Sequence, residues 1–338
     1  MTRTSPPIVA RAVCWALVFM GAAAIASSRQ WIDATFPGFF LMPNRVVPSA
    51  GLPGWAGGRD GRPVYHHVLL AVDGAQVDDA ATGYHLAAAQ PLGHGVEYTF
   101  VRDGAVERRT LPVVRFGWLE YLGVFGAYGL TGLAYLVLAF AGVRRWGPDD
   151  RFTALTAFAW AGATYSFSGI DLYGAGQLFR LHVAAEIFLA AGAAHVALVC
   201  PWPAFPSTRG APFVIYGTAA MLTLVYQIFL YEPRAYSAIH NLAQGLIGLP
   251  ILCLAVRFAL ALGAATGAHV RALQLQFGGI LVGLVAPAVV FAVSSLAGGD
   301  VPVSTAAWLN FVFPFAFTAG LALAARDAAS FAPIPLPV

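Results

Sequence analysis

Eight long apolar stretches, separated by polar joints, dominate the pattern of residues along the chain. They lie near 8–27, 117–143, 152–173, 181–201, 212–231, 238–262, 272–297 and 304–325. A helix needs about 20 mainly apolar residues to cross a bilayer, whereas a membrane β-strand is about half as long and alternates in polarity. The pattern therefore predicts a mainly α membrane protein with eight transmembrane helices, one followed by seven. Because most joints are short, we expect consecutive helices to be antiparallel.

The long joint between the first two apolar stretches, residues 28–116, has a different pattern. Asp73-Gly74 and Asp103-Gly104 are strong turn signals between runs of alternating polarity. Asp78 or Asp79 can serve as the N-cap of an Ala-rich helix. We expect a small α/β domain here, with strands over 65–72, 97–102 and 106–114 and a helix over 78–90.

Composition supports the membrane assignment and excludes several other classes of protein. Hydrophobic residues make up 59% of the chain, charged residues only 10%, and the mean hydropathy is +0.70. Soluble domains carry roughly 25% charged residues. A net charge of +3 without a basic cluster gives no sign of a nucleic-acid partner. The three cysteines fall in or beside apolar stretches, so we expect no disulfide framework.

Arginine placement predicts the orientation, because basic residues concentrate in short cytoplasmic loops. Of the arginines outside residues 28–116, most belong to one set of joints and ends: Arg3, Arg11, Arg144, Arg145, Arg151, Arg209, Arg271 and Arg326. The opposite short joints hold only Arg180 and Arg234. We therefore expect a bacterial cytoplasmic membrane protein with both termini in the cytoplasm and residues 28–116 outside. Its parts are 1–27 (first helix), 28–116, 117–326 (seven-helix region) and 327–338 (cytoplasmic Pro-rich tail). The first helix also has the features of a cleavable signal peptide, which would leave this topology unchanged.

Residues 45–115 resemble the C-terminal part of a bacterial PDZ domain. The similarity lies in Ala50-Gly51-Leu52, Val72-Asp73-Gly74 with Val77, and Val101-Arg102-Asp103-Gly104. PDZ domains bind a peptide C-terminus as an added strand beside a loop that holds its carboxylate. The resemblance implies that Gly38, Phe39 and Phe40 form this loop. The two phenylalanines, with Trp31, would equally suit the membrane interface.

The combination of one helix, a PDZ-like domain and seven more helices resembles the input module of certain bacterial sensor proteins. These include competence-type quorum-sensing histidine kinases and multi-pass cyclases and phosphatases. The similar segments are Asp171-Leu172-Tyr173-Gly174, Phe179-Arg180-Leu181-His182 with Glu186, and His195 with Cys200-Pro201. In those sensors a transmitter follows the last helix, whereas this sequence ends shortly after it. The resemblance implies that a separate cytoplasmic signalling protein receives the signal, or that the sequence is a fragment of a longer sensor.

Polar and charged residues near the outer ends of two helices form the candidate site. Such residues are costly in a membrane and are often functional. His182 and Glu186 are four residues apart and share a helix face, and Asp171 and Arg180 flank them across a short loop. These four residues can form a hairpin clamp, a ligand- or proton-sensing pocket, or a metal site. His195 lies on the opposite face and suits an interhelical hydrogen bond.

The sequence favours a sensory, receptor-like module that relays an external peptide or small-ligand signal and catalyses no reaction. It lacks a zinc-protease helix, a nucleophile elbow and a Walker loop, and we expect no cofactor and no metal. His195 and His240 lie at different depths, which disfavours haem. The alternative is a carrier or channel for a small solute or ion, because Pro250 and Pro287 interrupt two helices. The remaining intramembrane polar residues are expected to bond neighbouring helices: Gln227, His240, Asn241, Gln244, Gln274, Gln276 and Asn310.

Overall fold

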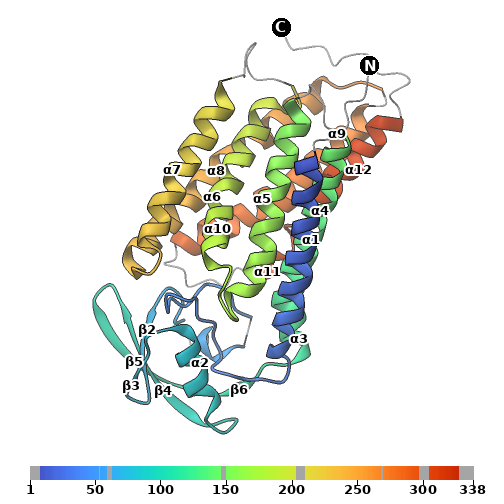
Figure 1. The fold of residues 1–338 in the computed structure, drawn as a ribbon. Coiled ribbons are helices and arrows are strands. Elements are labelled where there is room, and N and C mark those ends of the chain that lie inside the picture. The colour runs from blue at the N-terminus through green and yellow to red at the C-terminus, as the bar shows by residue number, and fades with distance from the viewer. Residues whose placement is uncertain are drawn as a thin grey trace.

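The computed structural model shows a helical bundle with a small α/β domain at one end (Figure 1). It describes residues 8–52, 54–58, 63–145, 150–202, 210–267, 269–296 and 304–326. The predicted tail, 327–338, and residues such as Arg3 and Arg209 lie outside these ranges. Helix α1 begins, and α12 ends, at the end of the bundle away from the α/β domain.

The bundle helices follow the predicted apolar stretches closely. They are α1 (Ile8–Ser28), α3 (Trp118–Tyr121) with the π-helical turn η3 (Leu122–Gly126) and α4 (Ala127–Arg144), α5 (Asp150–Leu172), α6 (Phe179–Val199), α7 (Ala211–Phe229), α8 (Pro233–Ala264), α9 (His269–Ile280) with the π-helical turn η4 (Leu281–Val285) and α10 (Ala286–Leu296), α11 (Ser304–Ala307) and α12 (Val312–Arg326).

Six helical segments of the described chain are long and apolar enough to cross a membrane, which identifies a multi-pass membrane protein. They are Ile8–Trp31, Trp118–Arg144, Phe179–Val199, Ala211–Phe229, Pro233–Ala264 and His269–Ser294. The predicted helical membrane protein is therefore confirmed, whereas the count of eight spans is not. Helix α12 is short, and α5 is long but rich in hydroxyl side chains.

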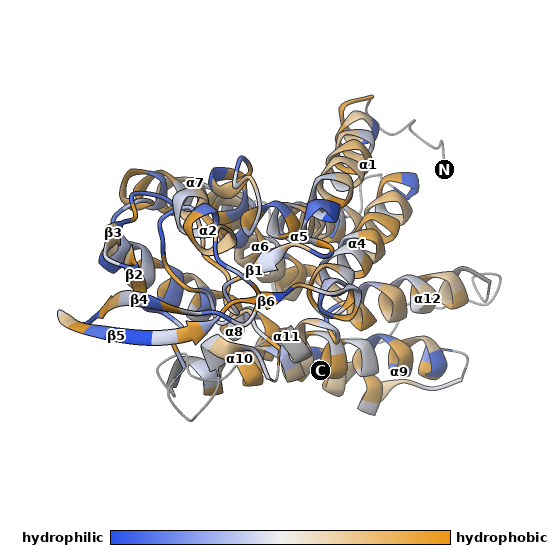
Figure 2. Ribbon diagram, turned by 90° about the horizontal axis from the view of Figure 1, so that it is seen from below, coloured by the Kyte–Doolittle hydropathy of each residue, from blue (hydrophilic) through white to orange (hydrophobic). Residues whose placement is uncertain are grey.

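Helix α5 tolerates its polar residues because it lies inside the bundle, between α1, α4 and α6. Thr156, Thr164 and Ser166 each donate a hydrogen bond to a carbonyl oxygen four residues earlier, at 2.7–2.8 Å. Such local bonds satisfy a hydroxyl without a partner from another helix. Low hydropathy in α5 thus reflects a helix surrounded by protein (Figures 1 and 2).

The α/β domain contains the strands and the helix that its pattern predicts. An antiparallel sheet has the strand order β3-β2-β4-β5, formed by β2 (Val68–Val72), β3 (Ala75–Gln76), β4 (Gly95–Arg102) and β5 (Ala105–Pro112). Both Asp-Gly turns have positive φ at each residue, as type I′ hairpin turns require. The Asp79 carboxylate caps α2 (Ala80–Ala88) by accepting from the Thr82 backbone N–H at 2.7 Å. The pattern did not predict the short ribbon of β1 (Thr35–Phe36) and β6 (Val114–Arg115).

An aromatic cluster joins this domain to the bundle. Phe40 stacks on Tyr173, which follows α5, with ring centroids 4.4 Å apart and an interplanar angle of 11°. Further rings surround this pair: Trp31, Phe36, Trp55, Phe116 and Phe125. The domain also has its own smaller core beneath the sheet, which includes Phe39, Tyr98 and Phe100. The aromatic cluster therefore fixes the domain on the end of α5, beside the start of α6.

Candidate functional site

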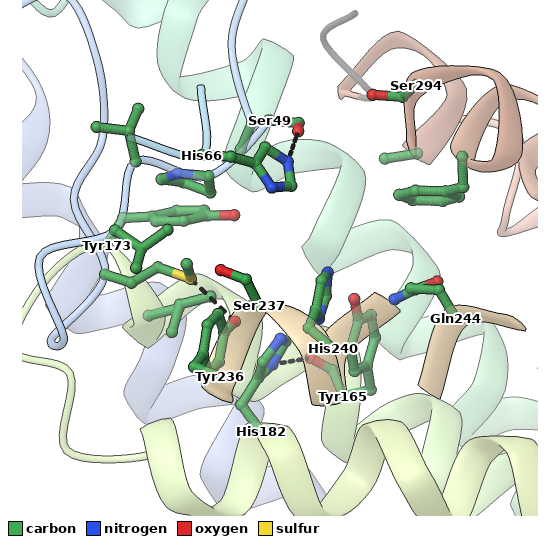
Figure 3. Close-up of a pocket in the computed structure, with 18 of the residues that line it drawn as sticks. Ser49, His66, Tyr165, Tyr173, His182, Tyr236, Ser237, His240, Gln244 and Ser294 are labelled. Atoms are coloured by element: carbon green, nitrogen blue, oxygen red, sulfur yellow. Dashed lines mark hydrogen bonds between the residues drawn. The ribbon is translucent and has the colours of Figure 1, made fainter. Parts of the chain in front are cut away.

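A polar cavity lies between the α/β domain and the bundle. The domain contributes the segment 46–50 and His66, and α5, α6 and α8 contribute most of the opposite wall. Its volume is about 110 Å³, enough for several water molecules. Figure 3 shows side chains from both sides of this junction cavity converging on it.

A larger bundle cavity, of about 630 Å³, lies beside the junction cavity among α4, α5, α6, α8 and α10. Residues that line both cavities include Tyr128, Tyr165, Asn241, Gln244 and Asn310. The two spaces are thus neighbours, separated by a few side chains.

The Glu186 carboxylate is the centre of a buried cluster that connects three helices. Only 4% of this residue is exposed. On α8, His240 Nδ1 lies 2.9 Å from Glu186 Oε1, and Gln244 Nε2 donates to the same oxygen at 2.6 Å. On α7, the Tyr226 hydroxyl donates to Oε2 at 3.4 Å. We call these four residues the Glu186 cluster.

The partners in the Glu186 cluster offset the cost of burying a carboxylate. A charge removed from water needs a counter-charge and hydrogen bonds, which a protonated His240, Gln244 and Tyr226 can supply. His240 Nδ1 lies within ion-pair distance of the carboxylate, at an angle unsuited to a regular hydrogen bond. This geometry leaves the pair open to rearrangement when a third group approaches.

His182, one turn before Glu186, lines the junction cavity. Its Nδ1 lies 3.1 Å from the Ser168 hydroxyl and 3.2 Å from the Tyr165 carbonyl oxygen, and its ring stacks on Tyr165 (Figure 3). A carbonyl oxygen only accepts, so a bond to it requires the proton on Nδ1. In the neutral ring, Nε2 then remains as a hydrogen-bond acceptor.

The structure gives the other two residues of the predicted four-residue cluster different partners. The Asp171 carboxylate accepts from the Leu178 backbone N–H at 2.7 Å and so closes the α5–α6 loop. Arg180 donates to Gln227 at 3.1 Å and covers the Tyr231 ring. The four residues therefore do not form one cluster. His182 and Glu186 line cavities, whereas Asp171 and Arg180 make contacts at the adjoining ends of α5 and α6.

Two further histidines, His195 and His66, each contact a hydroxyl group. His195 makes the expected interhelical contact, with Nδ1 3.2 Å from the Tyr216 hydroxyl on α7. His66, on the domain side of the junction cavity, contacts the Ser49 hydroxyl at 2.6 Å. The φ of His66 is +62°, a conformation that a non-glycine residue adopts rarely and often at functional sites.

The proposed peptide-carboxylate loop is buried in protein. Phe39 packs on Tyr98 and Phe100, Phe40 belongs to the aromatic cluster, and the Gly38 carbonyl accepts from the Gly57 N–H at 3.0 Å. Neither phenylalanine is more than 1% exposed, so their side chains are not available to the membrane interface.

The backbone next to this loop is bonded to a side chain of α2. The Tyr84 hydroxyl accepts from the Leu41 N–H at 2.6 Å and donates to the Leu41 carbonyl oxygen at 3.2 Å. Both backbone groups of Leu41 are therefore satisfied within the domain.

Sequence analysis assigned His240 and Gln244 to interhelical bonding and did not place them in the site. Both lie on α8 and, like His182 and Glu186 on α6, they are four residues apart. Two spans with polar pairs at the same spacing could have indicated that the pairs face each other. The missing information was the depth of each pair along its helix.

Within the described residues, no group of three His, Cys, Asp or Glu side chains is arranged to hold a metal ion. Comparison with protein-family models, with curated proteins and with solved structures finds no match to this chain. The functional argument therefore depends on the geometry of the site.

Proposed function

We propose that this chain is a receptor-like module of a bacterial cytoplasmic membrane, which binds a small ligand at the junction cavity and relays the event to a separate cytoplasmic partner. It catalyses no reaction in this proposal. The observation that carries the proposal is the shared construction of the cavity wall by the α/β domain and the bundle. A ligand that fills this space contacts both parts at once, so its binding is coupled to the way they pack.

The Glu186 cluster provides a route from the cavity to helix packing. Glu186 bonds α6 to both α7 and α8 through polar contacts. A ligand that takes one of these hydrogen bonds weakens the attachment of α7 or α8 to α6. Ligand binding shifts the balance between two helix arrangements only if its affinity for them differs, and competition for the Glu186 bonds supplies such a difference.

The proposed topology has eight spans, with α5 and α12 added to the six clearly apolar ones. The α/β domain lies outside and both termini lie in the cytoplasm. Arginines support this orientation, because Arg144, Arg145, Arg151 and Arg271 belong to the joints at the end of the bundle away from the domain.

We assign the α/β domain a PDZ-like fold because of its single helix and its two Asp-Gly hairpins at the expected separation. The buried loop at Gly38 and the Tyr84–Leu41 hydrogen bonds beside it favour a role as a cap on the bundle. In this role the domain encloses the ligand together with the helices.

A carrier for a small solute is the second candidate. The bundle cavity favours it, because about 630 Å³ of space next to a buried carboxylate lies among several helices. Transport would require this space to open alternately to the two sides of the membrane.

One comparison of variants discriminates between the two functions. Glu186→Gln keeps the side-chain shape and removes the charge, and Thr156→Val is a matched control, because Thr156 is buried and bonds only to Phe152 of its own helix. Hydrogen–deuterium exchange of the full chain in lipid nanodiscs should show, for Glu186→Gln alone, changes in the domain segment 46–50 and in the far ends of α7 and α8.

A change confined to the turn around Glu186 would overturn the receptor proposal. Proton flux into proteoliposomes, measured with a pH-sensitive dye, provides the second arm of the test. Flux through the wild-type chain that is lost in Glu186→Gln would support the carrier in its place.

A further inference from the structure

The bundle cavity has a polar end and an apolar body. Glu186, Asn241, Gln244 and Asn310 lie at the end next to the junction cavity. The body is lined by aliphatic and aromatic side chains, including Phe158, Leu189, Ile251 and Leu284. Pockets of about 300–1,000 Å³ with few polar groups are typical of sites for small amphipathic molecules.

The wall on the α8 side is thin and incomplete. Gly245 and Gly248 line the cavity, and a Cβ added at either glycine would meet no atom within 4 Å. Leu249 and Leu252 also line it, yet they are 67% and 58% exposed on the outer surface of the bundle. In a membrane, this surface contacts lipid tails, so the cavity is accessible from the bilayer beside α8.

Two prolines shape this opening. Pro250 lies within α8, and Pro287, which lines the cavity, follows the π-helical turn η4 at the start of α10. Proline removes a backbone hydrogen bond and bends or loosens a helix. Both helices beside the opening therefore depart from regular helical packing.

The charge of the lining selects among amphiphiles. Among the described lining residues, Glu186 is the only one that carries a formal charge at neutral pH, and none is basic. The nearest cationic partner, a protonated His240, is already paired with Glu186 and is not part of this lining, so an anionic head group would lie beside the carboxylate without a cation of its own, which is unfavourable in an apolar space. A hydroxylated head group can instead donate to carboxylate and amide oxygens and accept from amide N–H groups.

We propose that the bundle cavity binds an uncharged single-chain amphiphile that enters from the bilayer beside α8. Its apolar chain lies along the cavity body, and its hydroxylated head lies at Glu186, Asn241 and Gln244. This inference goes beyond the proposed function, because it assigns a ligand to the neighbouring bundle cavity, and it rests on that function only for the claim that binding is signalled.

The test uses two photoactivatable probes with the same chain, a monoacylglycerol and a fatty acid, with the full chain in nanodiscs. Cross-linked peptides are identified by mass spectrometry. The monoacylglycerol should label the cavity-lining parts of α8 and α10 at least about fivefold more than the ionised fatty acid, because the acid is repelled at Glu186.

Gly248→Phe fills the cavity and should reduce labelling by the monoacylglycerol at least about fivefold by steric exclusion. Gly263→Phe is the matched control, because Gly263 also lies on α8 in open space but lines neither cavity. Equal melting temperatures of the two variants would show that the loss of labelling is not caused by unfolding.

Equal labelling by both probes, unchanged by Gly248→Phe, would indicate ordinary boundary lipid and overturn the inference. Cavity labelling without the exchange changes expected for Glu186→Gln would leave the ligand class standing and remove the receptor function. If the exchange changes occurred without cavity labelling, the receptor function would stand and the ligand class would be wrong.

Discussion

Two groups of helices in the bundle use glycine in opposite ways. The first half is α4, α5 and α6, and the second half is α7 and α8. In α4, α5 and α6, a Cβ added at Gly142, Gly162 or Gly192 would lie 2.2–2.8 Å from an atom of a neighbouring helix. In α7 and α8, a Cβ added at Gly217 or Gly248 would meet nothing within 4 Å. Close approach of backbones gives the first half its tight packing, whereas the second half has space between its helices.

Part of the contact across the boundary of these halves is polar. Helix α6 bonds to α7 through His195–Tyr216 and Arg180–Gln227, and to α7 and α8 through Glu186. Polar interhelical bonds can exchange with a ligand or with water, whereas a close-packed glycine contact has no such alternative. The comparison thus contrasts a closely packed half with a second half that is joined to it partly through exchangeable polar bonds.

The largest loss of stability is expected when the contact between Glu186 and His240 is broken. His240→Leu leaves the Glu186 carboxylate buried without its cationic partner, and removal of one member of a buried pair costs about 3–5 kcal/mol. We expect a loss of about 3 kcal/mol in the free energy of unfolding, measured by denaturation in mixed micelles. His240→Gln, which keeps a hydrogen-bond donor, should lose less. Wild-type stability in His240→Leu would show that Glu186 is not charged in the folded protein.

The next prediction concerns the closely packed first half. Gly192→Val places its side chain 2.8 Å from the Cα of Phe158 on α5, and overpacking of this kind costs about 1–3 kcal/mol. The same change at Gly217 on α7 should alter the free energy of unfolding by less than about 0.5 kcal/mol. If both variants lost equal stability, the two halves would not differ in packing.

A smaller effect is expected in the α/β domain, away from both halves. Asp79→Ala removes the N-cap of α2 and should cost about 1 kcal/mol, whereas Asp79→Asn keeps a capping side chain. Hydrogen exchange of the Thr82 and Gly83 amides in the full chain measures the loss. Equal exchange in all three proteins would rule out the capping bond as a source of stability.

The same cap makes a prediction about pH. Hydrogen bonds from Thr82 hold the pKa of the Asp79 carboxyl below its usual range. A carboxyl whose pKa is lowered on folding adds stability above its unfolded pKa, and this stability disappears as the pH falls through the folded pKa. Exchange at Thr82 should therefore approach that of Asp79→Ala in acid, while Asp79→Asn, compared at each pH, should keep its protection.

Structural features that depend on residues close together in the sequence are predictable, whereas features that depend on packing between distant segments are not. Spans and hairpins depend on local patterns, such as long apolar runs and the Asp73-Gly74 turn, and the structure has six of the predicted spans and both hairpins at these patterns. The segment between α1 and β2 has little such pattern, because Phe36, Phe40 and Trp55 are ordered by packing against rings from the bundle. Helix α5 is similar, since its low hydropathy is explained by burial among other helices, and this burial cannot be read from its own residues.

Within the candidate site, the shared helix face predicts that His182 and Glu186 belong together, and the structure places them at neighbouring cavities. Sequence analysis could not separate them from Asp171 and Arg180, because proximity in sequence says nothing about which way a loop turns. The pairing of Glu186 with His240 depends on the relative depths of α6 and α8, which are set by packing.

The central claim is that the charge of Glu186 controls how α7 and α8 pack against the rest of the molecule. The most direct test is a distance between spin labels at Asp103, on an exposed hairpin, and Phe213, which is 86% exposed on α7. The background carries Cys253→Ala, because Cys253 is an exposed free cysteine. The account predicts that Glu186→Gln shifts the distance by about 2 Å or more, whereas Thr156→Val leaves it unchanged. Identical distance distributions in wild type, Glu186→Gln and Thr156→Val would contradict it.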